Sequence, residues 1–126
     1  MPERNKKTIM IVEDDIFVMD IYQTKVTQEG FDVVTAENGL EAIKKLEGGA
    51  KPDLMLLDIL MPYMDGLTFL KKKNQNDAWK DIPTILLTNL SQREEIEEGF
   101  ELGAKDYIIK SHFTPSEVME KINKYL

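Results

Sequence analysis

The sequence predicts an α/β fold in which five parallel strands form one doubly wound sheet with helices on both faces. Two observations support this fold class. Short apolar runs, typical of strands buried on both faces, alternate along the chain with longer segments whose apolar residues recur at helical spacing. The connections between them are short, and strict alternation with short connections gives right-handed crossovers between parallel strands.

The first strand and the first helix are predicted close to the amino terminus. Residues 8–12 form an apolar run that stops at three consecutive acidic residues, as a buried strand stops at the edge of a sheet. Residues 16–28 carry apolar side chains at helical spacing and lead to Gly30. Glycine is common just beyond the end of a helix, so this segment is expected to be helical.

The remaining elements follow in the same alternating order. Strands are expected at residues 31–35, 53–57, 82–87 and 105–109. Helices are expected at residues 39–46, 66–73, 92–102 and 115–125. The last helix has the clearest start signal, because Thr114 is a suitable N-cap, Pro115 suits the first helical position and Glu117 completes a capping box.

The composition indicates one globular domain. A chain of 126 residues matches the usual size of a single domain, which we expect to span residues 1–126 with a core at about 7–125. With 42% hydrophobic residues, the chain is expected to build a packed core. The 23 acidic residues outnumber the 16 basic ones and give a net charge of −7, which disfavours direct binding to nucleic acid.

Cysteine usage and hydropathy indicate the chemistry and the cellular compartment to expect. The chain has no cysteine, so disulfides, thiolate metal sites and a cysteine nucleophile are excluded. The apolar run near the amino terminus is too short for a signal peptide, and no later run approaches the ~20 residues of a membrane span. We therefore expect a cytoplasmic protein without membrane contact.

Four of the predicted strands end in residues that carry chemistry: Glu13 and Asp14, Asp58, Thr88 and Lys110. The carboxyl ends of parallel strands meet at one edge, where open α/β sheets bind their ligands. Two carboxylates ~4 Å apart repel by about 4 kcal/mol at an effective dielectric near 20, so a cation is needed among them. Mg²⁺, which prefers one or two carboxylates together with water and phosphate, answers that need.

Together these residues suit phosphoryl transfer. Asp58 is a carboxylate nucleophile able to form an acyl phosphate. The metal, Thr88 and Lys110 would stabilise the oxygens of the phosphoryl group during its transfer. Taken singly, each residue has a more common structural explanation. Acidic residues favour helix N-termini, an aspartate after a strand is often a cap or an Asx turn, a threonine is often a helix cap, and a lysine is usually a solvated charge. Their joint placement at the strand ends favours a site.

Four segments of the sequence resemble the receiver domains of bacterial two-component response regulators. They are residues 11–15 (IVEDD), 56–66 (LLDILMPYMDG), 85–88 (ILLT) and 103–110 (GAKDYIIK). The aspartate followed by Met61-Pro62 and then Asp65-Gly66 is highly specific to that family. The resemblance extends from Thr8 to Tyr125 and implies a flavodoxin-like (βα)5 receiver fold with the strand order 2-1-3-4-5.

The resemblance implies a role for the residues at the strand ends. Asp58 would be phosphorylated, and Glu13, Asp14, Asp58 and the backbone carbonyl of Leu60 would hold a Mg²⁺ ion. No organic cofactor is implied. Asp15 falls one position beyond the acidic pair and is interpreted as a helix cap.

A conformational switch follows from the same resemblance. Thr88 would be the switch hydroxyl, Lys110 the phosphate-binding ammonium, and Tyr107 the ring that changes rotamer when Thr88 moves toward the phosphoryl group. The surface made by helix 92–102, strand 105–109 and helix 115–125 would then bind an unidentified effector. The phosphoryl donor would be a histidine kinase or a histidine phosphotransfer protein.

Three departures from the family pattern stand near the site. Ser111 stands where proline is frequent, so a cis bond after Lys110 is disfavoured by the non-proline cost of about 2.5–4 kcal/mol. Asn89 replaces a small residue beside Thr88 and is expected to crowd the path of the hydroxyl. Leu60 and Leu90 are apolar and cannot orient an attacking water, which predicts slow loss of the phosphoryl group.

Two other function classes remain open on the sequence. A Mg²⁺-dependent phosphatase of the aspartyl-phosphate type has a similar site but needs an acid–base aspartate two residues after the nucleophile, where this chain has Leu60. An interaction module that works without phosphorylation would not need Glu13, Asp14, Thr88 and Lys110. The prediction is therefore a signalling phosphoacceptor whose only chemistry is its own phosphorylation and dephosphorylation, not a classical enzyme.

Overall fold

The computed structural model of the chain describes residues 6–89 and 92–126. Five parallel strands form one sheet in the order β2-β1-β3-β4-β5, which confirms the predicted fold class and strand order. The strands are β1 (Thr8–Val12), β2 (Asp32–Ala36), β3 (Leu54–Asp58), β4 (Thr84–Thr88) and β5 (Asp106–Ile109). The helices are α1 (Ile16–Gln28), α2 (Gly39–Glu47), α3 (Gly66–Asn74), α4 (Arg93–Glu101) and α5 (Pro115–Lys124).

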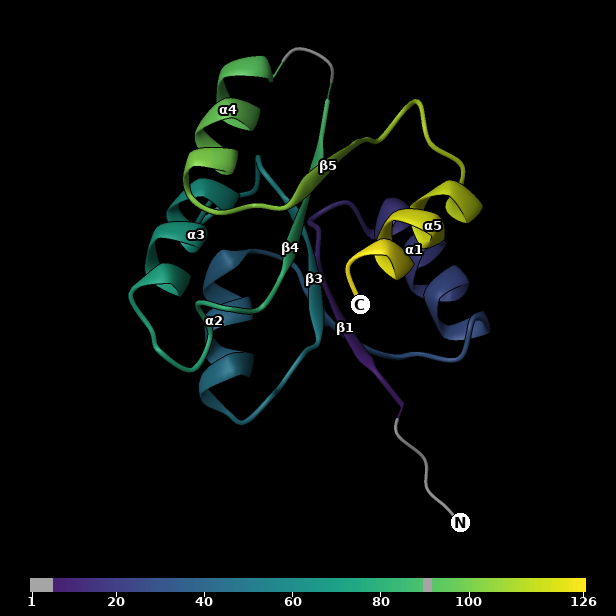
Figure 1. Ribbon diagram of the computed structural model, residues 1–126, viewed down its shortest axis with the longest axis horizontal. Helices are drawn as coiled ribbons and strands as arrows, with labels where there is room; N and C mark the ends of the chain where they lie inside the picture. The colour runs from purple at the N-terminus through teal and green to yellow at the C-terminus, as the bar shows by residue number, and fades with distance from the viewer. Residues whose placement is uncertain (1–5, 90–91) are drawn as a thin grey trace.

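The sheet is the middle layer of three. Helices α1 and α5 cover one face, and α2, α3 and α4 cover the other (Figure 1). Because successive strand residues point to opposite faces, each central strand contributes to both cores. Ile9, Leu56 and Ile85 pack toward α1 and α5, whereas Met10, Leu57 and Leu86 pack toward the other three helices.

The register of the sheet brings the carboxyl ends of four strands together. Val12 pairs with Leu57, Asp58 pairs with Leu87, and Thr88 pairs with Ile109. The residues that follow β1 and β5, and those that end β3 and β4, therefore lie at neighbouring positions along one edge. The fold thus assembles the residues that the sequence analysis selected.

Capping residues set the starts of four helices. The side chains of Asp15, Asn38, Asp65 and Thr114 accept hydrogen bonds from first-turn N–H groups of α1, α2, α3 and α5. Asp15 is thus a helix cap, as predicted, and the capping box of the last helix is also confirmed. Of the described helices, α4 is the one whose N-cap, Gln92, makes no side-chain cap hydrogen bond.

The start of the fourth strand differs from the prediction. The apolar run suggested a start at residue 82, but β4 begins at Thr84. Pro83 has no N–H group to donate to a neighbouring strand, although its carbonyl accepts a hydrogen bond from the Met55 N–H. Strand β1 and helix α1 have the predicted bounds, and the other boundaries differ by at most one residue. Among the described residues, no helix is long and apolar enough to cross a membrane.

Candidate functional site

A cleft of about 430 Å³ opens at the carboxyl edge of the sheet. Its walls come from the ends of β1, β3 and β5, the first turn of α1, and the residue after β4. The lining residues are Glu13, Asp14, Asp15, Val18, Asp58, Leu60, Asn89, Lys110 and Ser111. Five of the seven site residues predicted from the sequence therefore line one cleft, and the other two, Thr88 and Tyr107, do not.

Three carboxylates meet in this cleft. One oxygen each from Glu13, Asp14 and Asp58 lies within 4.8 Å of the others. Glu13 and Asp58 are 1% and 3% exposed, whereas Asp14 is open to solvent. The second oxygen of Glu13, Oε2, accepts a hydrogen bond of 3.0 Å from the Asp15 N–H. Two carboxyl groups are thus fixed in the protein interior and the third faces the opening.

Lys110 bridges the two buried carboxylates. Its Nζ lies 2.6 Å from Glu13 Oε1 and 3.1 Å from Asp58 Oδ2. The described residues contain no cis peptide bond, so the bond between Lys110 and Ser111 is trans. This agrees with the prediction that the cis form is disfavoured. With the bond in the trans form, the ammonium group of Lys110 still reaches Asp58.

The electrostatics of the cleft show that one ammonium does not balance the acidic oxygens. Burial, and after it the charge of Glu13, raise the pKa of Asp58 to about 8, and Lys110 counters both only in part. Burial alone would lower the pKa of Lys110, but its contacts with Glu13 and Asp58 raise it. The charge of the cleft therefore favours a further cation.

The donor set fits a hard divalent ion. Carboxylate oxygens from three residues converge, with one of them solvent-exposed, and Leu60 lines the same cleft. Oxygen ligands with room for water are the arrangement that Mg²⁺ prefers, whereas Zn²⁺ favours nitrogen and sulfur ligands. The acidic cluster is thus compatible with magnesium binding.

Gly66 fixes the backbone beneath the predicted nucleophile. Its N–H donates a hydrogen bond of 2.8 Å to the carbonyl of Ile59. A Cβ atom at position 66 would lie 2.3 Å from the carbonyl oxygen of Asp58, which is closer than non-bonded atoms approach. Only glycine fits there, so the glycine of the family-specific segment holds α3 against the end of β3.

Thr88 is fully buried at the end of β4, and its hydroxyl is engaged away from the carboxylates. Oγ1 lies 2.8 Å from Gln92 Oε1 and 3.1 Å from the carbonyl oxygen of Asn89. Asn89 contacts this hydroxyl through its backbone carbonyl and also lines the cleft, while crowding by its side chain stays a prediction. Leu90, the second apolar residue of the hydrolysis prediction, lies outside the described residues.

Sequence reasoning missed Gln92. The residue is 4% exposed, and its amide oxygen also accepts a hydrogen bond of 2.7 Å from the Asn89 N–H. A glutamine at the start of a predicted helix gives no sequence signal for such a role. Its position four residues after Thr88 was the only available indication, and that spacing is common.

Tyr107 lies on β5, half-buried between α4 and α5. Its ring contacts the ring of Phe100 edge to face, with centroids 6.0 Å apart. Lys121 Nζ lies 6.0 Å from the centre of the Tyr107 ring. The ring therefore lies on the surface that the sequence analysis proposed for an effector.

His112, next to the cleft residue Ser111, is exposed.

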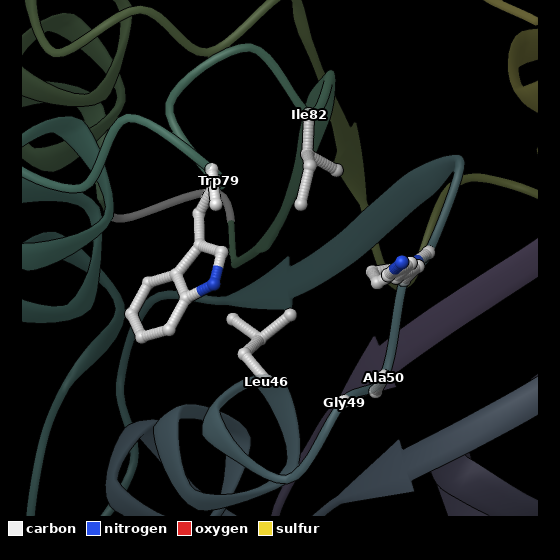
Figure 2. A pocket seen from close by; sticks show the side chains of 8 residues that line it. Leu46, Gly49, Ala50, Trp79 and Ile82 are labelled. Atoms are coloured by element: carbon white, nitrogen blue, oxygen red, sulfur yellow. The ribbon is translucent and has the colours of Figure 1, made fainter.

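A second hollow, of about 300 Å³, lies at the opposite edge of the sheet (Figure 2). Leu46, Ala50, Trp79 and Ile82 supply most of its apolar wall. None of the lining residues is acidic or a histidine, and the one charged residue is Lys51. This hollow offers no equipment for phosphoryl transfer.

Comparison with known proteins agrees with the fold. A family model described as response regulator receiver domain matches residues 9–123. The chain is 40% identical over 119 residues to the chemotaxis protein CheY of Bacillus subtilis, covering 94% of this chain and 96% of CheY. It is 38% identical over 126 residues to the probable transcriptional regulator ycf27 of Cyanophora paradoxa, covering 98% of this chain and 50% of that protein. The chain thus spans about half the length of several curated relatives.

The structural comparison leads to the same family. The chemotaxis response regulator CheY4 of Vibrio cholerae superposes with a TM-score of 0.88 at 27% identity, covering 97% of this chain and 100% of that structure. The matches of sequence and of fold therefore agree along nearly the whole chain. This protein belongs to the response regulator receiver domain family of two-component systems.

Proposed function

We propose that this chain is a phosphoacceptor switch that takes a phosphoryl group on Asp58 with Mg²⁺ bound beside it. Receiver domains are signalling phosphoacceptors, not classical enzymes, and they bind Mg²⁺ at an acidic site. The observation that carries the proposal is the cluster of Glu13, Asp14 and Asp58 with Lys110 3.1 Å from the Asp58 carboxylate.

The proposed ion would be held by Glu13, Asp14, Asp58 and the backbone carbonyl of Leu60. When bound, it supplies positive charge to the oxygens of the incoming phosphoryl group. An oxygen of Asp58 attacks the phosphorus, and the bond from phosphorus to the donor's nitrogen or oxygen breaks. Lys110 contributes a donor and a positive charge on the side of Asp58 already in contact with it.

The switch begins with the hydroxyl of Thr88. The new phosphoryl oxygens are stronger acceptors than the neutral groups that the hydroxyl now contacts, so Thr88 turns toward them. Its departure leaves space that the ring of Tyr107 fills. Because Tyr107 packs on Phe100 of α4 and lies near Lys121 of α5, a change of its rotamer alters the surface of α4, β5 and α5.

Family membership implies a histidine kinase partner. We propose that a histidine kinase or a histidine phosphotransfer protein supplies the phosphoryl group in the cytoplasm. The net charge of −7 disfavours direct binding of this domain to nucleic acid, so the output is assigned to a protein that binds the surface of α4, β5 and α5.

The test is phosphorylation by acetyl phosphate, followed by the intact mass of the protein. We expect the gain of one phosphoryl mass in the presence of Mg²⁺, no gain in EDTA, and no gain in Asp58→Asn. The matched control is Asp20→Asn, an exposed aspartate on α1 that should be labelled like the wild type. Equal labelling of Asp58→Asn and the wild type would refute the assignment of the phosphoacceptor.

The same preparation separates the alternative functions. Multiple turnovers of an external phosphoester would indicate a phosphatase, which the exposed Leu60 in place of an acid–base residue disfavours. Absence of any labelling, with the effector still bound, would indicate a module that works without phosphorylation.

A further inference from the structure

The side chain of Gln92 connects two parts of the proposed switch. Its amide oxygen lies 2.8 Å from Thr88 Oγ1 and 2.7 Å from the Asn89 N. The residue itself is the N-cap of α4. The hydroxyl that turns toward the phosphoryl group and the helix on the effector surface thus share one buried side chain.

The orientation of this amide is fixed by chemistry. The N–H of Asn89 can only donate, so the Gln92 atom that faces it must be the oxygen. The Thr88 hydroxyl has one hydrogen and two acceptors within reach, of which Gln92 Oε1 is the nearer at 2.8 Å against 3.1 Å for the Asn89 carbonyl. The hydroxyl therefore cannot bond to Gln92 and to a phosphoryl oxygen with the same hydrogen.

The bonded arrangement also leaves other polar groups near Gln92 without a side-chain partner. Among the described residues, no acceptor faces Gln92 Nε2, which is buried. The same bonding leaves the first turn of α4 without the side-chain cap that α1, α2, α3 and α5 each have. The side chain of Gln92 thus bonds to residues at the end of β4 and does not cap the first turn of α4.

We propose that Gln92 is a positioning residue that latches Thr88 in its unphosphorylated position and couples its release to the amino terminus of α4. The proposal deepens the proposed function and rests on phosphorylation of Asp58. When Thr88 leaves, Gln92 keeps the hydrogen bond from the Asn89 N–H but loses the one from the hydroxyl, so its side chain is held less firmly toward β4 and can shift with the first turn of α4.

The test is the affinity for beryllofluoride, a mimic of the aspartyl phosphate, in Mg²⁺, followed by the amide resonance of Tyr107. Gln92→Met keeps the length of the side chain but removes both amide groups. Loss of one or two hydrogen bonds from the unphosphorylated state predicts an apparent affinity about three- to tenfold higher than in the wild type. A generally damaged fold would instead lower the affinity. The exposed Gln23→Met on α1 is the matched control and should leave the affinity unchanged.

A double-mutant cycle shows whether the effect passes through the hydroxyl. In the Thr88→Val background, which lacks the hydroxyl, Gln92→Met is expected to leave the affinity unchanged. Equal effects of Gln92→Met in both backgrounds, or no effect in either, would overturn the latch. Gln92→Leu repeats the test if Gln92→Met does not fold. Failure of the wild type to bind beryllofluoride would refute the proposed function itself, whereas a wild type that binds with the affinity of Gln92→Met refutes the latch alone.

Discussion

Removal of the Asp58 charge is expected to stabilise the metal-free protein. The buried carboxylate lies among Glu13, Asp14 and Lys110, and burial raises its pKa from 3.8 to about 8. Between these two values the folded protein binds a proton that the unfolded chain releases. The free energy of unfolding therefore falls as the pH rises from about 4 to 8. The contribution of Asp58 to stability is present in full only below about pH 4.

The stability lost at pH 7 follows from the part of this pH range that lies below pH 7. Roughly 3 pKa units lie between 3.8 and pH 7, which corresponds to about 4 kcal/mol at 1.36 kcal/mol per unit. Asp58→Asn also loses the attraction to Lys110, so we expect it to be about 2–4 kcal/mol more stable than the wild type at pH 7 in EDTA. The difference should shrink toward pH 4 and also in excess Mg²⁺, which binds and stabilises the wild type.

Urea unfolding followed by circular dichroism measures this difference. The exposed Asp20→Asn serves as the control, with an expected change within about 0.5 kcal/mol. Two results would refute the claim that the acidic groups of the cleft destabilise the metal-free protein. One is an Asp58→Asn protein less stable than the wild type in EDTA, and the other is a gain in stability of the same size at pH 4 and pH 7.

Three further predictions concern other residues. Burial lowers the pKa of Lys73, which is 3% exposed, to about 8, so stability should rise with pH from about 8 to 10.5 as the folded protein releases this proton first. Lys73→Met should gain about 1–2 kcal/mol at pH 7, a gain that narrows toward pH 10 in urea unfolding; the exposed Lys72→Met should show neither effect. Gly66→Ala should cost about 2–3 kcal/mol in the same assay and slow labelling by acetyl phosphate, because its Cβ would meet the carbonyl of Asp58; wild-type stability would contradict this. The phosphorylated wild type should lose its label slowly, and Leu60→Asn, which offers a polar group to water, should lose it about tenfold faster by intact mass; rapid loss from the wild type would be the opposite result.

The fold and the strand-end residues were accessible from the sequence because both depend on local pattern. Five apolar runs placed the strands, and the residues directly after them had to share an edge once the strands were parallel. The exception at the start of β4 has a local cause, because Ile82 is apolar but Pro83 cannot donate to a sheet ladder.

Features that depend on tertiary packing were not accessible. Glu13 and Asp14 are adjacent acids, yet one is buried against Lys110 and the other faces solvent. Lys73 stands in a run of three lysines that reads as solvated, yet its Nζ donates a 3.1 Å hydrogen bond to the Lys80 carbonyl from the interior. The contact between Gln92 and Thr88 depends on how β4 meets α4, which no spacing rule specifies.

A calorimetric titration of the protein with Mg²⁺ tests the central claim most directly, because the claim is that the cleft needs one more cation than Lys110 provides. We expect one ion to bind per chain in the wild type, with weaker binding in Asp14→Asn, which removes the solvent-facing carboxylate. Absence of binding by the folded wild type, or identical binding by Asp14→Asn, would contradict the proposed metal site and the phosphoryl chemistry that depends on it.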